Sequence, residues 1–519
     1  MNRSIRKVAV ALVVLLAALF VNLNFVQVVK GSDYRNDPRN RRVLLNEYAS
    51  SRGQIIVQGT AVAQSTATND ELKYLRSYPQ GPRYAAVTGY YSYIYGSSGI
   101  EAAEDSVLSG NDNRLFGSRL TDLLTGRNSR GGSVELTLDK AAQQAAYSAL
   151  VKSSNGTARR GAVVALDPST GAILAAVSTP SYDPSKLSSH NANSIDKTWR
   201  ALQADNGSAL RNRDFSETYP PGSTFKVVVA AAALKDGVTP DTHLLAPNGY
   251  YPQDGRTGTC SGTNPACVQN FGGEKCDNGK TATLAFSLAK SCNTTFAALA
   301  VEKLGGDKIA AEAKLFGFDS DKPLQVPMTV AGSTVGTQAD LSQNGFLART
   351  AFGQQDVSMT PLQGAMISAA VANNGILMQP YLVDKELAPN LSVLKKTAPT
   401  QLSQALEPDL DLELQSMMEG VITAPEGTGH SAAITDIPGV VVGGKTGTAD
   451  TGRKLKNGKD EPPHAWFTGY ALEKGVPKIA VAVIIENGGV QGNETTGGAA
   501  AAPVARAVME AYLRAHEGG

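Results

Sequence analysis

Residues 219–226 read YPPGSTFK, and the apolar run VVVAAAAL follows at residues 227–234. Two prolines and a glycine end the preceding element, so we expect a helix to begin at or next to Ser223. Lys226 then lies one helical turn further on the same face. A serine at a helix N-terminus meets the positive end of the helix dipole, and a neutral lysine amine one turn away can take its proton. The apolar run predicts a buried helix that holds this pair rigidly and ends at Gly237.

The Ser-x-x-Lys spacing is weak support by itself, because it occurs repeatedly in this chain. The other matches begin at Ser4, Ser194, Ser287 and Ser392. A solvated helix face is the commoner meaning of such a match. The interpretation of Ser223 as a nucleophile therefore depends on other segments.

Length and composition are those of a globular protein. The chain has 519 residues, of which 42% are hydrophobic and 18% charged, enough for two or three domains. Its formal net charge of +1 supplies no strong basic field for phosphates. We therefore expect no nucleic-acid partner.

The first 30 residues predict a membrane anchor. Arg3, Arg6 and Lys7 precede an uncharged stretch at residues 8–29, which Lys30 closes. As a helix this stretch would span about 33 Å, enough to cross the hydrocarbon core of a bilayer. The basic N-terminus favours a cytoplasmic start, with everything after Lys30 outside the cytoplasm. Cleavage as a signal peptide is the alternative, although no clear Ala-x-Ala site follows.

All four cysteines fall within one segment of the exported part. They are Cys260, Cys267, Cys276 and Cys292. Oxidising surroundings favour disulfides, and four cysteines permit three pairings. We prefer Cys260–Cys267 with Cys276–Cys292, and a single disulfide is also compatible with the sequence. A zinc site is the rival, but the spacing lacks a Cys-x-x-Cys pair, and the chain's histidines form no ligand spacing.

Alternating and helical apolar patterns predict an α+β chain. The expected strands are residues 52–57, which a turn at 58–59 follows, residues 134–138, residues 162–166 and 172–177, which form a hairpin around residues 167–171, and residues 440–442, 465–472 and 478–485. The expected helices are residues 140–152, 227–234, 282–304, 338–376 in two pieces, and 499–515. Strands at both ends with helices between them imply an antiparallel sheet closed by N- and C-terminal pieces.

Two further segments strengthen the case for Ser223. Ser291-Cys292-Asn293 lies where two helical patterns meet, so its polar side chains can project into a cleft. Residues 445–448 read KTGT at the end of a predicted strand, and Lys-Thr-Gly occurs nowhere else in the chain. Glycine lets a substrate backbone approach closely, and lysine with hydroxyls suits a peptide carboxylate. Ser-x-Asn alone recurs elsewhere, and an ordinary turn is the alternative for residues 445–448.

The three motifs in this order resemble those of the penicillin-binding protein and serine β-lactamase superfamily, with gaps of about 70 and then about 150 residues. Residues 161–168, 353–354, 360–363 and 465–470 also resemble the transpeptidase domain. Residues 52–55 and 99–101 resemble the N-terminal module of class B penicillin-binding proteins. The resemblance covers nearly the entire chain.

This resemblance implies the transpeptidase fold, an antiparallel sheet flanked by helices with an added helical subdomain. Residues 1–30 would be a cytoplasmic stub and transmembrane anchor. Residues 31–154 would form a small non-catalytic pedestal that holds the active site away from the membrane. Residues 155–519 would form the transpeptidase domain.

The resemblance also implies roles for the first two motifs. Ser223 would attack a D-alanyl-D-alanine stem peptide, with Lys226 as the base. Ser291 would pass a proton to the departing D-alanine nitrogen. Asn293 would hydrogen-bond the amide of the donor peptide.

The third motif would bind the end of the substrate. Lys445 would supply positive charge, while Thr446 and Thr448 on either side of Gly447 would bind the terminal carboxylate. Backbone N–H groups of Ser223 and Thr448 would form the oxyanion hole. An acceptor amine would then resolve the acyl-enzyme into a crosslink.

The implied chemistry needs no cofactor and no metal. The implied partners are peptidoglycan stem peptides, β-lactams as covalent inhibitors, the membrane, a polytopic glycan polymerase and other cell-wall synthesis proteins. A DD-carboxypeptidase is the first alternative, with water instead of an amine as acceptor. A β-lactamase and a non-catalytic β-lactam sensor are the others. The anchor, the N-terminal module and the lack of an obvious deacylating glutamate motif disfavour a β-lactamase.

Cys292 departs from the family pattern, since aspartate is common at this position in relatives. A disulfide at Cys292 would fix the loop that carries Ser291 and Asn293, and would make the reactivity of this loop sensitive to reduction. A buried inert thiol is the alternative.

Overall fold

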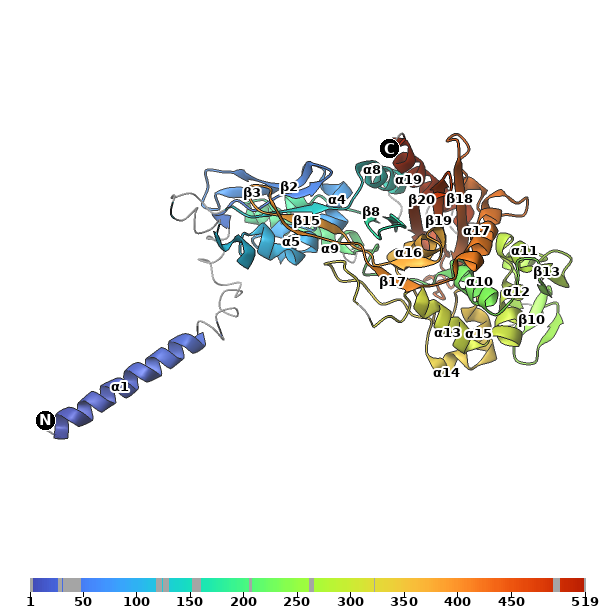
Figure 1. The fold of residues 1–519 in the computed structure, drawn as a ribbon, viewed down its shortest axis with the longest axis horizontal. Helices are drawn as coiled ribbons and strands as arrows, with labels where there is room; N and C mark the ends of the chain where they lie inside the picture. The colour runs from blue at the N-terminus through green and yellow to red at the C-terminus, as the bar shows by residue number, and fades with distance from the viewer. Residues whose placement is uncertain are drawn as a thin grey trace.

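The computed structural model describes residues 3–26, 30, 48–117, 124, 130–151, 160–204, 208–260, 266–321, 323–488 and 495–517. Helix α1 (Arg3–Asn24) stands at one end of the long axis, a mixed region follows, and the largest region lies at the other end (Figure 1). Within α1, residues Ile5–Asn24 have a mean hydropathy of 2.2 and are long and apolar enough to cross a membrane. The helix begins earlier than the predicted stretch at 8–29, of which residues 27–29 lie outside the described part.

The middle region is built on a mixed sheet whose strand order is β16-β15-β6-β1-β2-β3 among the described residues. Its strands are β1 (Ile55–Val57), β2 (Thr60–Ala67), β3 (Tyr74–Ser77), β6 (Ser133–Leu136), β15 (Val383–Leu387) and β16 (Val393–Lys396). β1 falls within the predicted strand at 52–57 but begins only at Ile55, and the predicted turn at 58–59 is confirmed, because Gln58 and Gly59 both have positive φ. β15 and β16 come from far along the chain, which the sequence patterns did not indicate.

The two N-terminal segments that resemble a class B module meet in this region. Arg52 Nε donates to Glu101 Oε2 at 2.6 Å, and Arg76 Nε donates to Glu101 Oε1 at 2.6 Å. Glu101 is fully buried. A buried carboxylate needs such partners, so these residues maintain the interior of the region.

The large region contains an antiparallel sheet with the strand order β18-β19-β20-β7-β8. Its strands are β7 (Gly161–Leu166), β8 (Ile173–Thr179), β18 (Val440–Ala449), β19 (His464–Glu473) and β20 (Val476–Ile485). The predicted hairpin and the closure of the sheet by N- and C-terminal strands are confirmed. β18 is longer than predicted, because the KTGT residues continue the strand instead of ending it.

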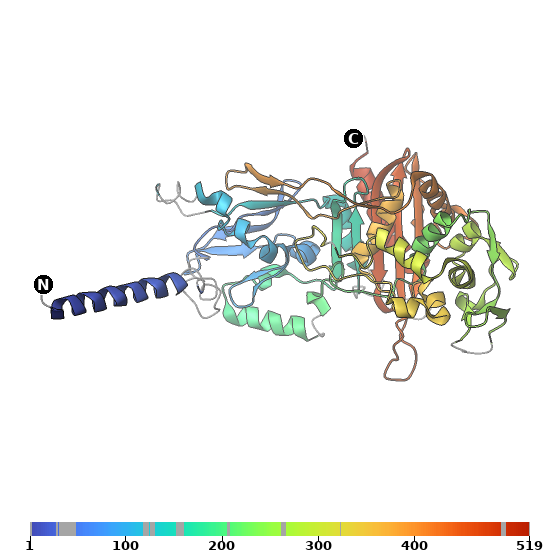
Figure 2. The ribbon, with the colours of Figure 1, turned by 60° about the horizontal axis from the view of Figure 1, so that its bottom comes forward.

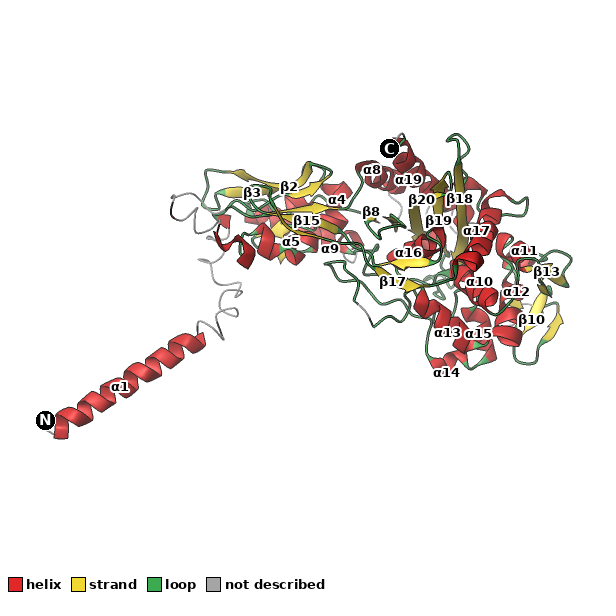
Figure 3. Ribbon diagram, viewed as in Figure 1, coloured by secondary structure: helices red, strands yellow, loops and turns green. Residues whose placement is uncertain are grey.

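Helices cover this sheet on both faces, as Figure 3 shows. α8 (Lys140–Val151) and α19 (Ala502–Ala515) pack on each other and on the sheet, while α16 (Pro361–Ala372) packs on β7, β19 and β20. Residues 479–485 of β20 are all buried, which is expected for a strand covered on both sides. Asp139 caps the N-terminus of α8, because its Oδ1 accepts a hydrogen bond from Ala142 N at 2.8 Å.

A mainly helical part lies beyond the β18 edge of the sheet (Figure 2). Its helices are α10 (Lys226–Lys235), α11 (Leu284–Ala289), α12 (Asn293–Leu299), α13 (Gly306–Leu315), α14 (Gln338–Leu341) and α15 (Asn344–Thr350). Its strands are β9 (His243–Leu245), β10 (Gly249–Tyr251), β11 (Arg256–Gly258), β12 (Val268–Gln269) and β13 (Thr281–Thr283). Of the two helical pieces expected at 338–376, the second is confirmed as α16, but the first is divided, because Ser342 and Gln343 separate α14 from α15.

The other elements connect these parts. They are α4 (Gly81–Thr88), β4 (Tyr91–Ser92), β5 (Gly96–Ser97), α5 (Gly99–Ala103), α6 (Asp105–Leu108), α9 (Ala192–Gln203), β14 (Ile376–Met378), β17 (Gln401–Gln404), α17 (Pro408–Thr423) and α18 (Gly497–Ala500). The proposed domain boundary at 154/155 lies outside the described residues. α8 on its N-terminal side packs on the large sheet, and β15 and β16 on its C-terminal side join the middle sheet.

Candidate active site

The nucleophile segment is clamped by the elements around it. Tyr219 N donates to Met359 O at 3.0 Å, and Gly222 N donates to Gly353 O at 2.8 Å. Trp466 Nε1 donates to Pro220 O at 3.0 Å from strand β19. These bonds fix the backbone on both sides of the turn that presents Ser223.

Glycine at position 222 is required by the approach of this turn to β18. Its φ is +55°, and a Cβ there would lie 2.6 Å from Thr448 O. Gly447 permits the same contact from the other side, since a Cβ on it would lie 2.8 Å from Pro221 O. Ser223 is therefore held directly beside the KTGT segment.

Ser223 lies in a 3₁₀ turn, residues Gly222–Phe225, and α10 begins at Lys226. This agrees with a helix starting next to Ser223, and Gly237 ends it with a φ of +80°. Residues 226–234 are all buried. The helix is the rigid support that its apolar sequence predicts.

The second motif lies between α11 and α12, as predicted, and meets Lys226. Lys226 Nζ is 2.7 Å from Ser291 O, 3.3 Å from Ser291 Oγ and 2.7 Å from Asn293 Oδ1. Ser291 has a φ of +66°, in the left-handed region that side chains other than glycine rarely adopt. The surrounding contacts must hold this conformation, because it is intrinsically unfavourable.

The third motif completes the cluster. Lys445 Nζ donates to Ser291 Oγ at 2.9 Å and to Thr446 O at 3.1 Å. Ser291 Oγ thus lies between the two lysine amines. Within the described part of the chain, no hydrogen bond joins Lys226 Nζ to Ser223 Oγ, and catalytic hydrogen bonds of free enzymes commonly tighten only when substrate binds.

Burial sets the charge of the two lysines. Burial, and then the charge of nearby Lys445, hold the pKa of Lys226 well below its usual value. Burial lowers the pKa of Lys445 to about 7. Both lysines therefore lose their protons more readily than a lysine in water. A neutral Lys226 amine can donate its two protons to Ser291 O and Asn293 Oδ1, and its lone pair then remains available to accept a proton.

The cluster lies at a cleft of about 520 Å³. Ser223, Ser291, Asn293, Thr446 and Thr448 line it, whereas Lys226 and Lys445 lie behind its wall. The motifs did not indicate the other polar and aromatic lining residues, which include Phe271, Glu274, Lys290, Gln354, Glu426, Thr428 and Asp450. Most of these come from loops, where no periodic pattern marks a functional side chain.

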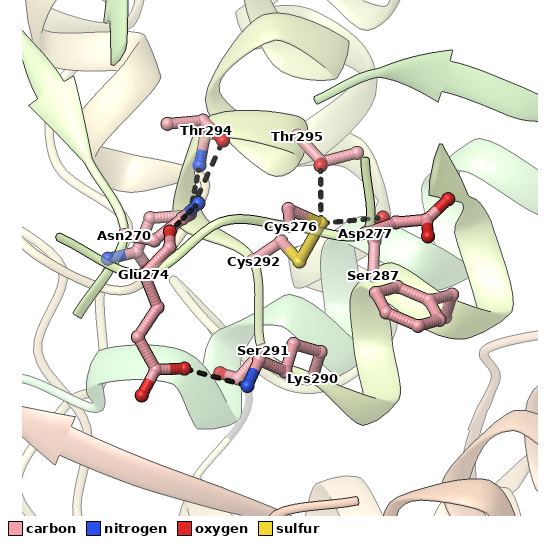
Figure 4. The surroundings of a disulfide bond; sticks show 12 residues. Asn270, Glu274, Cys276, Asp277, Ser287, Lys290, Ser291, Cys292, Thr294 and Thr295 are labelled. Carbon is pink, nitrogen blue, oxygen red and sulfur yellow. Dashed lines mark hydrogen bonds and ion pairs between the residues drawn. A yellow bond between two sulfur atoms is a disulfide. The ribbon is translucent and has the colours of Figure 1, made fainter. Parts of the chain in front are cut away.

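Both preferred disulfides are present, Cys260–Cys267 and Cys276–Cys292. Cys292 is bonded, so the alternative of a free inert thiol is wrong. Figure 4 shows how Cys276–Cys292 ties the segment around Asn270 and Glu274 to the loop carrying Ser291. A 2.7 Å ion pair between Lys290 and Glu274 and a 3.1 Å bond from Thr294 N to Asn270 Oδ1 support the same connection.

We predict that removing this disulfide slows acylation by benzylpenicillin. The double variant Cys276→Ser/Cys292→Ser loses the covalent tie that helps to hold Ser291 at positive φ, and such conformations cost about 1–3 kcal/mol. An acylation rate about tenfold lower is expected, measured by stopped-flow fluorescence. Cys260→Ser/Cys267→Ser is the matched control and should leave the rate unchanged. An unchanged rate in the first variant, with its fold intact by circular dichroism, would show that the disulfide does not act on the loop.

No group of three or more His, Cys, Asp or Glu side chains with metal-binding geometry occurs among the described residues. The residues that the three motifs bring to the cleft are lysines, hydroxyls and an amide. This donor set suits nucleophilic and proton-transfer chemistry.

The sequence is similar to known family models and to characterised proteins. The family model of the penicillin binding protein transpeptidase domain matches residues 161–510, and that of the penicillin binding protein A dimerisation domain matches residues 52–134. The chain is 45% identical over 515 residues to the peptidoglycan D,D-transpeptidase PbpA of Mycolicibacterium smegmatis, and the alignment covers 99% of each protein. It is 43% identical over 514 residues to PbpA of Mycobacterium tuberculosis, again over 99% of each.

Solved structures of related proteins have the same fold as this chain. The ceftriaxone acyl-enzyme complex of penicillin-binding protein A from M. tuberculosis superposes with a TM-score of 0.82 at 43% identity, covering 90% of this chain and 100% of that chain. The penicillin G acyl-enzyme complex of the same protein gives a TM-score of 0.80 at 42% identity, covering 89% and 100%.

Proposed function

The chain belongs to the penicillin-binding protein transpeptidases, and from that premise we propose that its cleft catalyses peptidoglycan D,D-transpeptidation through an acyl-enzyme at Ser223. One observation carries the assignment of residues. Segments more than two hundred residues apart bring Lys226, Ser291, Asn293 and Lys445 into one hydrogen-bonded cluster beside Ser223. A chance Ser-x-x-Lys match would not gather these partners.

In the acylation step, Ser223 Oγ attacks the carbonyl carbon of the penultimate D-alanine. The hydroxyl proton passes to the lone pair of Lys226, which burial keeps available. The N–H groups of Ser223 and Thr448 face the developing oxyanion, and losing one such donor typically costs about 3–4 kcal/mol. The close approach of the two backbones at Gly222 supports this pairing, because an added Cβ there would lie 2.6 Å from Thr448 O.

Collapse of the intermediate needs a proton on the leaving nitrogen. Ser291 Oγ is 3.3 Å from Lys226 Nζ and faces the cleft, so it can pass a proton from Lys226 to that nitrogen. The C–N bond breaks, D-alanine leaves, and the stem peptide remains as an ester on Ser223. Asn293 receives a hydrogen bond from Lys226 and holds the amine in position for both transfers.

The third motif binds the donor peptide. β18 is an edge strand, and Thr446 and Thr448 lie two residues apart on the same face of it and line the cleft. An extended peptide can add to this edge, with its terminal carboxylate at the two hydroxyls and near the charge of Lys445. Gly447 serves the packing of the strand on the nucleophile segment rather than contact with the substrate.

An acceptor amine completes the reaction by attacking the ester carbonyl and releasing Ser223. A β-lactam acylates the same serine, and its ester persists because water reaches it poorly. The acyl-enzyme complexes solved for the related M. tuberculosis protein support this part of the proposal.

The N-terminal parts place the cleft relative to the membrane in this proposal. α1 anchors the chain in the cell membrane as a single span, with the catalytic domain outside the cytoplasm. Most of residues 31–154 belong to a pedestal, whose sheet β15 and β16 complete, and most of residues 155–519 belong to the catalytic domain, on whose sheet α8 packs. A polytopic glycan polymerase and other cell-wall synthesis proteins are the expected membrane partners, and peptidoglycan stems are the substrate.

The test supplies the exported part of the chain with a pentapeptide stem ending in D-alanyl-D-alanine and with an acceptor stem that bears a free amine. Mass spectrometry of the products should show a crosslinked dimer together with released D-alanine. Shortened donor without any dimer would mean that water is the acceptor and would favour the carboxypeptidase. Unchanged donor would contradict both.

A further inference from the structure

We propose that Thr428 is a positioning residue that orients the Thr446 hydroxyl toward the terminal carboxylate of the substrate. The inference rests on the proposed function, since it concerns the carboxylate end of the same cleft. Thr428 belongs to none of the three motifs, and it enters the cleft from the loop that follows α17.

The loop that carries Thr428 is hydrogen-bonded and closely packed on both sides. Gly427 N donates to Ala424 O at 2.8 Å, and Gly429 N donates to Val421 O at 2.9 Å. A Cβ at Gly427 would lie 2.5 Å from Val421 O, so the loop is pressed against the end of α17. On its other side, a Cβ at Gly498 would lie 2.2 Å from Thr428 O. The threonine therefore has a fixed backbone position.

The hydroxyl of Thr428 joins the two walls of the cleft. Its Oγ1 is 2.6 Å from Thr446 Oγ1 on β18, and it donates a longer, 3.4 Å bond to Ala289 O at the end of α11. Ala289 lies two residues before Ser291. Thr428 thus connects the strand that binds the carboxylate to the segment that leads into the second motif.

The 2.6 Å contact between the Thr428 and Thr446 hydroxyls decides where the Thr446 proton points. Each hydroxyl has a single proton to donate. If Thr428 donates to Ala289 O, Thr446 must donate to Thr428 across the 2.6 Å contact, and only lone pairs of Thr446 then face the cleft. If Thr428 instead donates to Thr446, the Thr446 proton is free to point at a ligand.

A bound carboxylate selects the second arrangement. Lone pairs of Thr446 would repel its negative charge, whereas a free Thr446 proton can donate a charge-assisted hydrogen bond to it. The short contact is then kept and only the 3.4 Å bond to Ala289 O is lost. Donation from Thr428 also polarises the Thr446 hydroxyl and strengthens its bond to the carboxylate.

The experiment compares Thr428→Val with Thr428→Ser, using benzylpenicillin and its carboxyl methyl ester as probes. Thr428→Val should lower the second-order acylation rate with benzylpenicillin about tenfold, as expected for weakening one hydrogen bond to a charged group. Thr428→Ser keeps the hydroxyl and should stay within about twofold of the wild type. Neither change should affect acylation by the methyl ester, which lacks the negative charge. Thr423→Val is the matched control, because that hydroxyl bonds only within α17 and lies outside the cleft.

A double-mutant cycle tests whether Thr428 acts through Thr446. Adding Thr428→Val to Thr446→Val should lower the benzylpenicillin rate no further than Thr446→Val alone. The proposal is overturned if the two effects multiply, or if Thr428→Val slows the acid and the ester equally. A wild-type protein that is not acylated by benzylpenicillin would instead contradict the proposed function. Thermal unfolding of each variant, compared with Thr428→Ser, separates these outcomes from loss of the fold.

Discussion

Ser223→Ala should abolish covalent labelling of the protein by a fluorescent penicillin. The variant lacks the only oxygen that our account places in position to attack the lactam carbonyl. Removing the serine from an enzyme whose catalytic residues act as a unit typically costs on the order of 10⁶ in turnover. Ser223 is partly buried, and the turn is held by backbone bonds of its neighbours, so the fold should survive.

The exported part of the chain is incubated with the fluorescent penicillin, and covalent labelling is then measured by gel fluorescence. Ser216→Ala is a matched control, because Ser216 is an exposed serine in the same segment and donates to Thr329 O at 2.9 Å away from the cleft. It should label like the wild type. Persistent labelling of Ser223→Ala at the wild-type level would mean that another residue is the nucleophile.

Lys226→Gln should lower the acylation rate by on the order of 10²–10⁴, the usual contribution of a positioned general base. Glutamine has a similar length but no basic amine to accept the serine proton. Arginine should be equally inactive at this position, because it stays protonated at any accessible pH. Lys280→Gln is the control, since Lys280 is exposed and lies outside the cleft.

The protonation states of Lys226 and Lys445 should determine how kcat/KM depends on pH. Lys226 must be neutral to act, and its pKa is lowered, so kcat/KM should rise with pH through that lowered pKa. Lys445 must be charged to attract the carboxylate, and its pKa is about 7, so kcat/KM should fall above about pH 7. Lys445→Arg keeps its charge and should move the falling limb to higher pH. A profile that is flat from pH 5 to 9 in the wild type would contradict these roles.

The sequence predicted those features that depend on neighbouring residues. The buried α10 helix follows from an unbroken apolar run, and its end follows from Gly237. The β7–β8 hairpin follows from two apolar runs around a turn, whereas the sequence left three cysteine pairings open and only favoured the one that joins Cys276 to Cys292. The motif order then indicated which serine to consider.

Features that depend on contacts between distant segments were not predictable. β15 and β16 join the middle sheet although no local pattern distinguishes them from strands of the large sheet. The positive φ of Ser291 is imposed by what surrounds it, since serine itself disfavours that conformation. Thr428 was not predicted, because no periodic sequence pattern marks a single threonine in a Gly-rich loop. Its proposed role depends on its contact with Thr446, which only the folded chain shows.

The most direct test of the central claim is to trap the acyl-enzyme with a stem pentapeptide by acid quenching, then to map it by tryptic digestion and mass spectrometry. Our account predicts a tetrapeptidyl ester on the fragment of residues 214–226, located at Ser223, with one D-alanine released for each ester. An ester on the fragment that contains Ser291, or consumption of the pentapeptide without any ester, would contradict it.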